Sequence, residues 1–262
     1  MRKMITNVLF VLGILICMLP SVLNIMSKKD QQDIIGSYKS EVSNMDSEEI
    51  EKEIEKAKEY NKYQYDMQIG ENLLTEEPEY EEILAQKDFM CTISIPKINV
   101  ELPVYHDTDN DVLAKALGHL KGTSLPVGGK NTHSFITGHR GLPSSKLFVR
   151  LDEIEKNDMF YIQIYDKVLA YKVVNVQIVE PNDTKVMKIE PDRDLVSLVT
   201  CTPYGINTHR LIVTGERTEY KATKAAVKQV SKPSARELLS CLPLVLAALF
   251  ITDSLNERRR NP

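Results

Sequence analysis

Two long apolar runs lie near the ends of the chain, and the first is free of charge from Met4 to Ser27. About 20 apolar residues span the hydrocarbon of a bilayer as a helix. Arg2 and Lys3 precede the run, and basic residues flank the cytoplasmic end of a span. We therefore expect residues 1–27 to form an N-terminal transmembrane anchor. A cleaved signal peptide is the alternative, but the end of the run has no Ala-x-Ala pattern.

The second apolar run, Leu238 to Thr252, is shorter than a usual membrane span. A buried helix or an interfacial segment is the alternative interpretation. Three arginines at positions 258–260 follow it, which is typical of a cytoplasmic flank. We expect a linker over residues 219–235, a second transmembrane helix over 236–255 and a cytoplasmic tail over 256–262. Both termini then lie in the cytoplasm, and the part between the spans lies outside.

Between these runs, the first pattern is helical. Apolar residues recur at spacings of four and three within the charged stretch Asp46–Tyr60, which predicts a surface helix with Ser47 as its N-cap. Residues 61–86 are less regular and predict a loop that crosses to the main domain. Residues 28–88 are therefore expected to form an extracytoplasmic helical and lid-like segment.

From Phe89 onward the pattern changes to short alternating or apolar runs, which predict strands. The expected strands are Cys91–Ile95, Leu102–Tyr105, Ser134–Thr137, Asp158–Tyr165, Val168–Val179, Leu195–Thr200 and Leu211–Val213. Short helices are expected at Asn110–Leu117 and Lys146–Ile154. About eight short strands indicate a mainly β fold, a closed or nearly closed β-barrel, since closure removes exposed strand edges. We expect one barrel domain over residues 89–218.

Composition limits the partners. The 42% hydrophobic content is enough for one domain with a core. The net charge of −4 argues against nucleic acid as a partner, because binding phosphates needs a basic face. No set of histidines, cysteines and acids has the spacing of a metal site, and we expect neither a metal nor a cofactor.

The four cysteines are too few for a secreted disulfide framework. Cys17 and Cys241 lie in the apolar ends. Cys91 alternates with isoleucines and is interpreted as a small core residue. Cys201 ends the apolar run Leu195–Thr200. By itself it would be read as a buried structural cysteine, so its neighbours decide its interpretation.

Three reactive groups come at strand ends: the thiol of Cys201, the guanidinium of Arg210 and the imidazole of His139. Strand ends can meet at one rim of a sheet. Nucleophile, proton carrier and fixed positive charge suffice for acyl transfer through a thioester. His139 has the best context of the five histidines because Gly138 and Gly141 flank it just past an apolar strand. A surface role is the alternative for Arg210, and a surface or core role is the alternative for each histidine.

The motifs Cys201-Thr-Pro-Tyr-Gly-Ile-Asn-Thr-His-Arg210, Thr137-Gly-His139-Arg-Gly-Leu-Pro and Gly118–Gly129 resemble those of the sortases. These are membrane-anchored cysteine transpeptidases of Gram-positive bacteria. The residues of the quoted motifs are similar to those of the pilus-type (class C) branch. The resemblance covers roughly Thr92 to Glu216. It implies an eight-stranded barrel in which Cys201 is the nucleophile, His139 the general acid/base and Arg210 the stabiliser of the oxyanion. Three further residues are expected to bind substrate: Thr200, Thr202 and His209.

The resemblance also implies the reaction. The thiolate attacks the Thr carbonyl of a Leu-Pro-x-Thr-Gly-like sorting signal, and a lysine of another pilin resolves the acyl-enzyme as an isopeptide bond. The expected partners are pilin or surface proteins bearing the signal, and the cytoplasmic membrane. One alternative is a sortase that anchors proteins to cell-wall peptide. Another is a non-catalytic assembly module, which would need a broken trio, whereas all three residues are present.

One motif of the pilus-type branch is missing. Such sortases usually carry an Asp-Pro-aromatic lid before the barrel. Here the corresponding stretches read Tyr65-Asp66-Met67 and Glu77-Pro78-Glu79-Tyr80, and neither matches. The sequence therefore predicts a weakly gated site, and the side chains considered as lid candidates are Tyr63, Tyr65, Asp66 and Tyr80.

Overall fold

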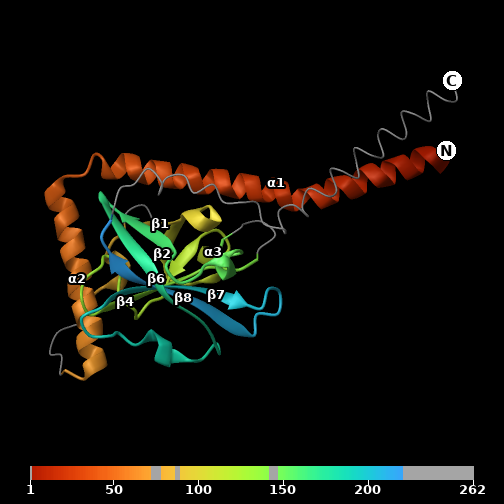
Figure 1. Ribbon diagram of the computed structural model, residues 1–262. Coiled ribbons are helices and arrows are strands. Elements are labelled where there is room, and N and C mark those ends of the chain that lie inside the picture. Colours follow the sequence, from red (N-terminus) through yellow and green to blue (C-terminus); the bar gives the residue numbers. More distant parts are fainter. Residues whose placement is uncertain (1, 72–77, 86–88, 142–146, 221–262) are drawn as a thin grey trace.

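The computed structural model describes residues 2–71, 78–85, 89–141 and 147–220. Figure 1 shows a barrel with one long helix, α1 (Arg2–Val42), running past it and a second, α2 (Ser47–Ile69), along its side. The short helical segments are η1 (Tyr80–Glu82), η3 (Pro96–Ile98), α3 (Asn110–Leu113), η4 (Leu151–Glu153) and η5 (Thr184–Met187). The expected second span and cytoplasmic tail, and the linker beyond residue 220, lie outside the described residues.

The barrel is closed and has eight strands, which confirms the expected fold. They are β1 (Phe89–Ile95), β2 (Val100–His106), β3 (Leu117–His119), β4 (Thr132–Thr137), β5 (Met159–Ile164), β6 (Lys167–Val179), β7 (Asp194–Thr202) and β8 (His209–Thr218). Their order around the barrel is β1-β2-β3-β4-β7-β8-β6-β5. The β2–β3 and β4–β7 pairs are parallel and the others antiparallel.

Alternation along the strands fills the barrel. Leu198 of β7 lies opposite Val213 of β8, and both belong to the buried core. Side chains of a strand point alternately to the two faces. Cys201 is three residues beyond Leu198 and pairs with Arg210, so the thiol and the guanidinium share the opposite face, at the end of the β7–β8 pair.

Helix α1 passes from an apolar half to a packed half without a break. Large apolar side chains along its first half are exposed, including Ile25 at 71%. Farther along, Gln31 Nε2 donates to the carbonyl of Lys115 at 2.8 Å, and the amide of Tyr165 donates to Tyr38 Oη at 2.9 Å. By length and composition, α1 is the one described helix that is suited to cross a membrane. The boundary expected after residue 27 is thus not a structural break.

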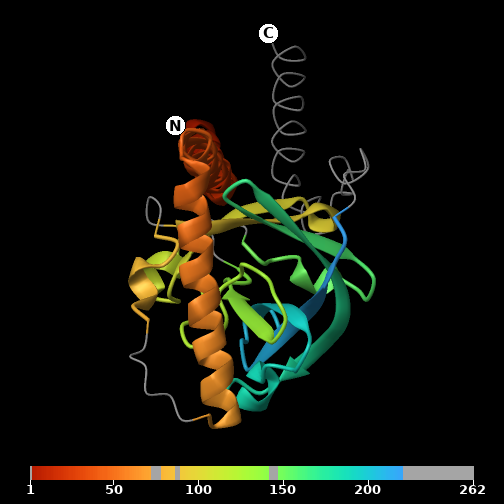
Figure 2. The ribbon, with the colours of Figure 1, turned by 90° about the vertical axis from the view of Figure 1, so that its left-hand side faces the viewer.

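Helix α2 is longer than the sequence pattern predicted. Asp46, not Ser47, caps it, accepting from the amide of Glu48, and it runs through residues 61–69, which were expected to be a loop. The reason is the buried amide of Asn61, which exchanges two hydrogen bonds with the backbone of Leu125, at 3.0 and 2.6 Å. Figure 2 shows α2 lying lengthwise against the barrel.

Two other expectations were wrong. The helix expected over Asn110–Leu117 stops at Leu113, because Leu117 begins the three-residue strand β3, which pairs with β2 and β4. The helix expected over Lys146–Ile154 is only the single turn η4 in its described part. In both places the apolar side chains are buried, as expected for a helix. At Leu117 strand pairing buries them, and at η4 a single turn does.

Candidate active site

A cleft of about 150 Å³ opens where β4 and β7 end. It is formed by the segment that follows β4 and by the turn between β7 and β8. Seven residues line it: His139, Arg140, Gly141, Cys201, Tyr204, Gly205 and Asn207. The structure thus brings the expected thiol and imidazole to one small, solvent-accessible space, although they are 62 positions apart in the sequence.

Arg210 lies directly across the strand pair from Cys201. Facing side chains on one side of an antiparallel pair have Cβ atoms about 4.5–5.5 Å apart. Arg210 Nη1 donates to the carbonyls of Asn207 and His209, at 3.3 and 3.2 Å. These bonds hold the guanidinium over the β7–β8 turn, next to the cleft that Asn207 lines.

The backbone around His139 is fixed on both sides. The amide of Gly138 donates to the carbonyl of Val199 at 3.0 Å, and the amide of Phe148 donates to the carbonyl of His139 at 3.0 Å. A Cβ at Gly138 would lie 2.4 Å from Leu117 and 2.9 Å from Phe148. Glycine is therefore required at this position for the chain to approach the core so closely.

The other four histidines have different surroundings. Both ring nitrogens of buried His119 are bonded, to Tyr80 Oη and to the carbonyl of Ser124, each at 2.9 Å, and burial lowers its pKa to about 4. Burial also lowers the pKa of His133, whose ring contacts Ser197 Oγ and the carbonyl of Lys188. His106 contacts the carbonyl of Ile83. Of the five, His139 is the one that lines the cleft.

None of the three residues expected to bind substrate lines the cleft. Thr200 and Thr202 are buried, and neither lines the cleft. Thr200 Oγ1 donates to the carbonyl of Gly138 at 2.7 Å, and Thr202 Oγ1 accepts from Arg140. His209 is exposed at the start of β8, with Nδ1 2.9 Å from Thr208 Oγ1. The two threonines therefore connect β7 to the segment that carries His139.

Sequence reasoning missed four residues of the cleft, Arg140, Tyr204, Gly205 and Asn207, of which the first two carry large side chains. Arg140 is buried and lies 2.5 Å from the carboxylate of Asp152, and nothing in the sequence distinguishes it from a surface arginine. Tyr204 is 55% exposed, and a Cβ at Gly141 would lie 2.5 Å from its ring. The small Gly141 is the sequence signal here, since it lets the ring of Tyr204 lie against the backbone.

The three described cysteines differ sharply in their surroundings. Cys17 is exposed on α1, Cys91 is fully buried, and Cys201 is half-buried at the cleft. Burial raises the pKa of the Cys91 thiol, which keeps it protonated and unreactive. The interpretation of Cys91 as a core residue is confirmed by its place in the barrel interior.

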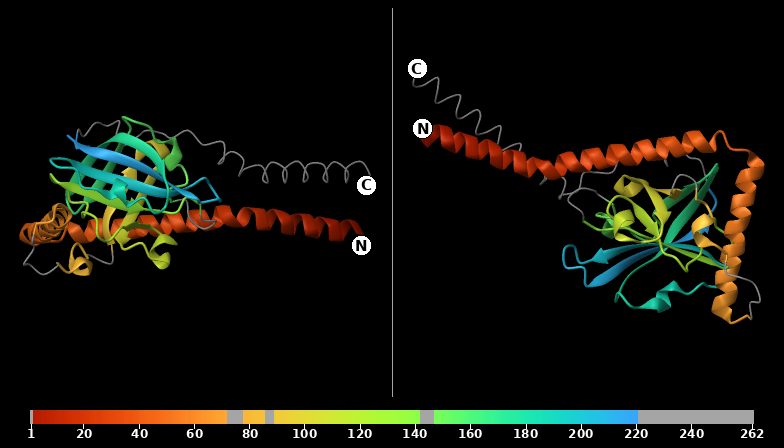
Figure 3. Two further views of the ribbon diagram at one scale, coloured as in Figure 1. Left: turned by 90° about the horizontal axis from the view of Figure 1, so that it is seen from below. Right: turned by 180° about the vertical axis from the view of Figure 1, so that it is seen from behind.

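The lid candidates do not line the cleft. Tyr63, Tyr65 and Asp66 belong to α2, and Figures 1 and 3 show α2 on the opposite side of the barrel from the β7–β8 turn. Asp66 is buried and pairs with Lys62. Tyr80 is buried, with its ring stacked on His119.

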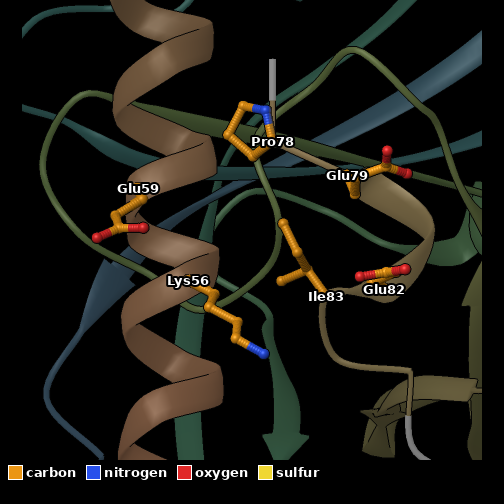
Figure 4. Close-up of a pocket in the computed structure, with 6 residues that line it drawn as sticks. All are labelled: Lys56, Glu59, Pro78, Glu79, Glu82 and Ile83. Atoms are coloured by element: carbon orange, nitrogen blue, oxygen red, sulfur yellow. The ribbon is translucent and has the colours of Figure 1, made fainter. Parts of the chain in front are cut away.

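The chain around Tyr80 faces α2 instead. A second cleft, of about 180 Å³, separates residues 78–83 from that helix. Figure 4 shows Lys56 and Glu59 on α2. Ile83 belongs to the opposite segment, and its side chain points into the space between that segment and the helix. This described part of the pre-barrel segment therefore packs far from Cys201.

Comparisons with known proteins agree with this geometry. Residues 93–218 match the model of the sortase domain family. Sortase C1 from Streptococcus agalactiae has a crystal structure that is 42% identical; the match covers 72% of this chain and 100% of that one, with a TM-score of 0.66. An X-ray structure of Clostridium perfringens sortase C with the C-terminal cell wall sorting motif is also 42% identical, covering 72% of this chain and 99% of that one, with a TM-score of 0.64.

More distant relatives match about half of this chain. Sortase D of Bacillus subtilis is 33% identical over 128 residues, which are 48% of this chain and 62% of that protein. Sortase A of Streptococcus agalactiae is 30% identical over 127 residues, 47% of this chain and 51% of that protein. The chain thus spans between half and two thirds of these relatives. The barrel, the cleft and the matches that cover 99–100% of the two sortase C structures agree. The chain belongs to the sortase family.

Proposed function

We propose that this protein is a pilus-type sortase, a cysteine transpeptidase that acts through a thioester on Cys201. The observation that carries the proposal is the single cleft lined by Cys201 and His139, with Arg210 directly opposite Cys201 in the adjacent strand. Full-length matches to sortase C structures support the pilus type. The proposed substrate is a Leu-Pro-x-Thr-Gly-like sorting signal.

In the first half of the reaction, the Cys201 thiolate attacks the Thr carbonyl of the signal. The carbonyl oxygen becomes an oxyanion, and the Arg210 guanidinium stabilises it with fixed donors. The Thr–Gly bond then breaks, and His139 gives a proton to the leaving glycine amine. The products are an acyl-enzyme thioester and a released Gly-terminated segment.

In the second half, the lysine amine of another pilin attacks the thioester. His139 takes the proton that the amine loses, the C–S bond breaks, and the thiolate of Cys201 is restored. The new bond is an isopeptide. The second candidate function is anchoring of surface proteins to cell-wall peptide, which uses the same chemistry with a different amine. The matches to sortases A and D support it as the alternative.

We further propose that the enzyme is held at the outer face of the cytoplasmic membrane. Helix α1 supplies the first anchor, and residues 236–255 supply the second. Both termini are then cytoplasmic. Reporter fusions at each end test this arrangement, and a C-terminal reporter found outside the cell contradicts the second span.

A peptide carrying the sorting signal tests the chemistry. Mass spectrometry of the full-length protein should show an acyl adduct on Cys201, absent in Cys201→Ala. Cys91→Ala is the matched control, because its thiol is fully buried, and it should retain the adduct. An adduct that persists in Cys201→Ala contradicts the assignment, and a wild-type protein with no adduct favours the non-catalytic module.

The acceptor is identified by adding two amines to the same reaction. A pilin peptide with a lysine is compared with a cell-wall-type peptide amine at equal concentration. The pilus-type proposal expects the product to carry the isopeptide bond to lysine. Exclusive transfer to the cell-wall-type amine supports the anchoring function instead.

A further inference from the structure

The backbone pairing between β4 and β7 ends just before the reactive residues. The last register pair is Thr137 with Val199, and the amide of Gly138 still reaches the carbonyl of Val199. Cys201 lies two residues farther along β7. His139 lies two residues beyond the end of β4. No backbone ladder therefore sets the spacing between the thiol and the imidazole.

Side chains continue the connection where the ladder stops. Thr200 Oγ1 donates to the carbonyl of Gly138 at 2.7 Å, and Arg140 Nη1 donates to Thr202 Oγ1 at 2.7 Å. Thr200 and Thr202 are the two residues that flank Cys201. Gly138 and Arg140 are the two that flank His139. Each neighbour of the thiol is thus bonded to a neighbour of the imidazole.

The second of these bonds depends on a buried charge. Arg140 is 6% exposed, and its Nη2 lies 2.5 Å from Asp152 Oδ2 in η4. A buried charge is stable only when it is paired, and the planar guanidinium offers two donors at a fixed angle. Nη2 of the guanidinium pairs with the carboxylate of Asp152, and Nη1 donates to the hydroxyl of Thr202. The position of Thr202 is therefore fixed relative to both η4 and the His139 segment.

We propose that Arg140, through Thr202, is a positioning residue that sets the spacing between His139 and Cys201. The inference rests on the proposed function, in which His139 gives a proton to the amine that leaves the carbonyl carbon attacked by Cys201. Proton transfer requires hydrogen-bond reach, and a misplacement of about 1 Å costs on the order of 10²-fold in rate. Arg140 acts on the proton transfer through geometry and makes no bond to the reacting atoms.

The test compares isosteric changes at Thr202 in the full-length protein, with a sorting-signal peptide as substrate. Thr202→Val keeps the shape and removes the acceptor, whereas Thr202→Ser keeps the acceptor. We expect Thr202→Val to lower kcat about tenfold or more with KM changed less than about twofold, because only the reactive geometry is altered. Thr202→Ser should restore most of kcat.

Changes at Arg140 sharpen the test. Arg140→Lys keeps the charge but cannot bond Thr202 and Asp152 with one rigid fork, so its kcat should fall as well. The double variant Arg140→Met with Thr202→Val should be no slower than Arg140→Met alone, since both remove one interaction. Arg150→Met is the matched control: Arg150 is also largely buried and pairs with Glu153 of η4, but that pair does not reach β7.

Four results overturn the proposal: an unchanged kcat in Thr202→Val, a change confined to KM, additive losses in the double variant, or an equal loss in Arg150→Met. The Thr202 pair decides the matter if Arg140→Met does not fold. Failure of the proposed function is a separate outcome, seen as a wild-type protein that forms no acyl-enzyme.

Discussion

His119 and His139 belong to neighbouring parts of one barrel, but the structure uses them in opposite ways. His119 is fully buried, and both of its nitrogens are bonded within the protein. His139 is half-buried and lines a cleft with a thiol. A neutral, fully bonded ring has no capacity left to move protons, whereas a ring beside a nucleophile does. The comparison shows that burial and partners, and not residue type, separate a structural histidine from a candidate catalyst.

The largest expected effect comes from replacing His139, the histidine proposed to be catalytic. His139→Gln should lower kcat for acyl-enzyme formation by about 10²–10⁴-fold, the usual contribution of a general acid or base. His119→Gln should leave kcat per folded molecule nearly unchanged, because its ring does not line the cleft. Single-turnover kinetics with a sorting-signal peptide measure both. Equal losses in the two variants would refute the division.

The next effect concerns the positive charge at the cleft. Arg210→Lys should lower kcat by about 10²–10³-fold, because a lysine keeps the charge but loses the fork that faces the oxyanion. The same kinetic assay measures it. Arg217→Lys, a change on the same strand at the far end of β8, is the control and should retain activity. Near wild-type turnover in Arg210→Lys means that Arg210 does not contact the reacting carbonyl.

The two glycines near His139, Gly138 and Gly141, differ in what packs against them. Gly138→Ala places a Cβ against buried Leu117 and Phe148 and should lower the free energy of unfolding by about 1–3 kcal/mol. Gly141→Ala meets only the exposed ring of Tyr204, which can move, so the loss should stay below about 0.5 kcal/mol. Urea unfolding measures both variants. A larger loss at Gly141 than at Gly138 contradicts the packing described.

The last effect belongs to His119 and appears as pH dependence of stability. The folded-state pKa of about 4 lies below the ordinary value of 6.5, so the unfolded chain binds more protons between these two values. The free energy of unfolding should therefore fall as the pH falls through this window, by about 2 kcal/mol between pH 7 and pH 5 from this group. Urea unfolding at the two pH values measures it.

His119→Gln removes that contribution and should flatten the dependence, leaving the smaller part due to His133, whose pKa is also lowered by burial. His209→Gln is the control, because its side chain is exposed and its loss should leave the slope unchanged. A slope that His119→Gln does not change means that the burial of His119 is not what makes stability depend on pH.

Most strands, and the meeting of Cys201 and His139 at one cleft, could be predicted from the sequence, because alternation and strand-end motifs are local signals. The catalytic roles of these residues and of Arg210 stay predictions. Strand β3 could not be predicted, since its three residues, Leu117–His119, gain their structure only from β2 and β4 on either side. The extension of α2 depends in the same way on Asn61 bonding Leu125, a residue far along the chain. Local pattern predicts an element, but distant partners decide its length.

The same limit explains the site. Cys201, His139 and Arg210 are candidates because each stands at the edge of an apolar run. Arg140 was missed because its burial comes from Asp152 and Thr202, which are distant in sequence. Thr200 and Thr202 are expected to bind substrate, but they flank Cys201 in the strand. Alternation turns them to the other face, where their hydroxyls bond the His139 segment and Arg140 instead.

The unbroken helix α1 has a mechanical consequence. From residue 27 to Val42 it extends about 22 Å at 1.5 Å per residue. Gln31 and Tyr38 fasten this stretch to the barrel. Pro20 lies inside α1 ahead of this stretch, and proline in a helix interior bends the helix. The stretch beyond residue 27 is therefore the part whose direction is tied to that of the barrel. In the proposed arrangement, with the apolar half of α1 in the bilayer, this fastened stretch sets how far the cleft stands from the lipid, and the proposed substrate has to present its reacting threonine at that distance.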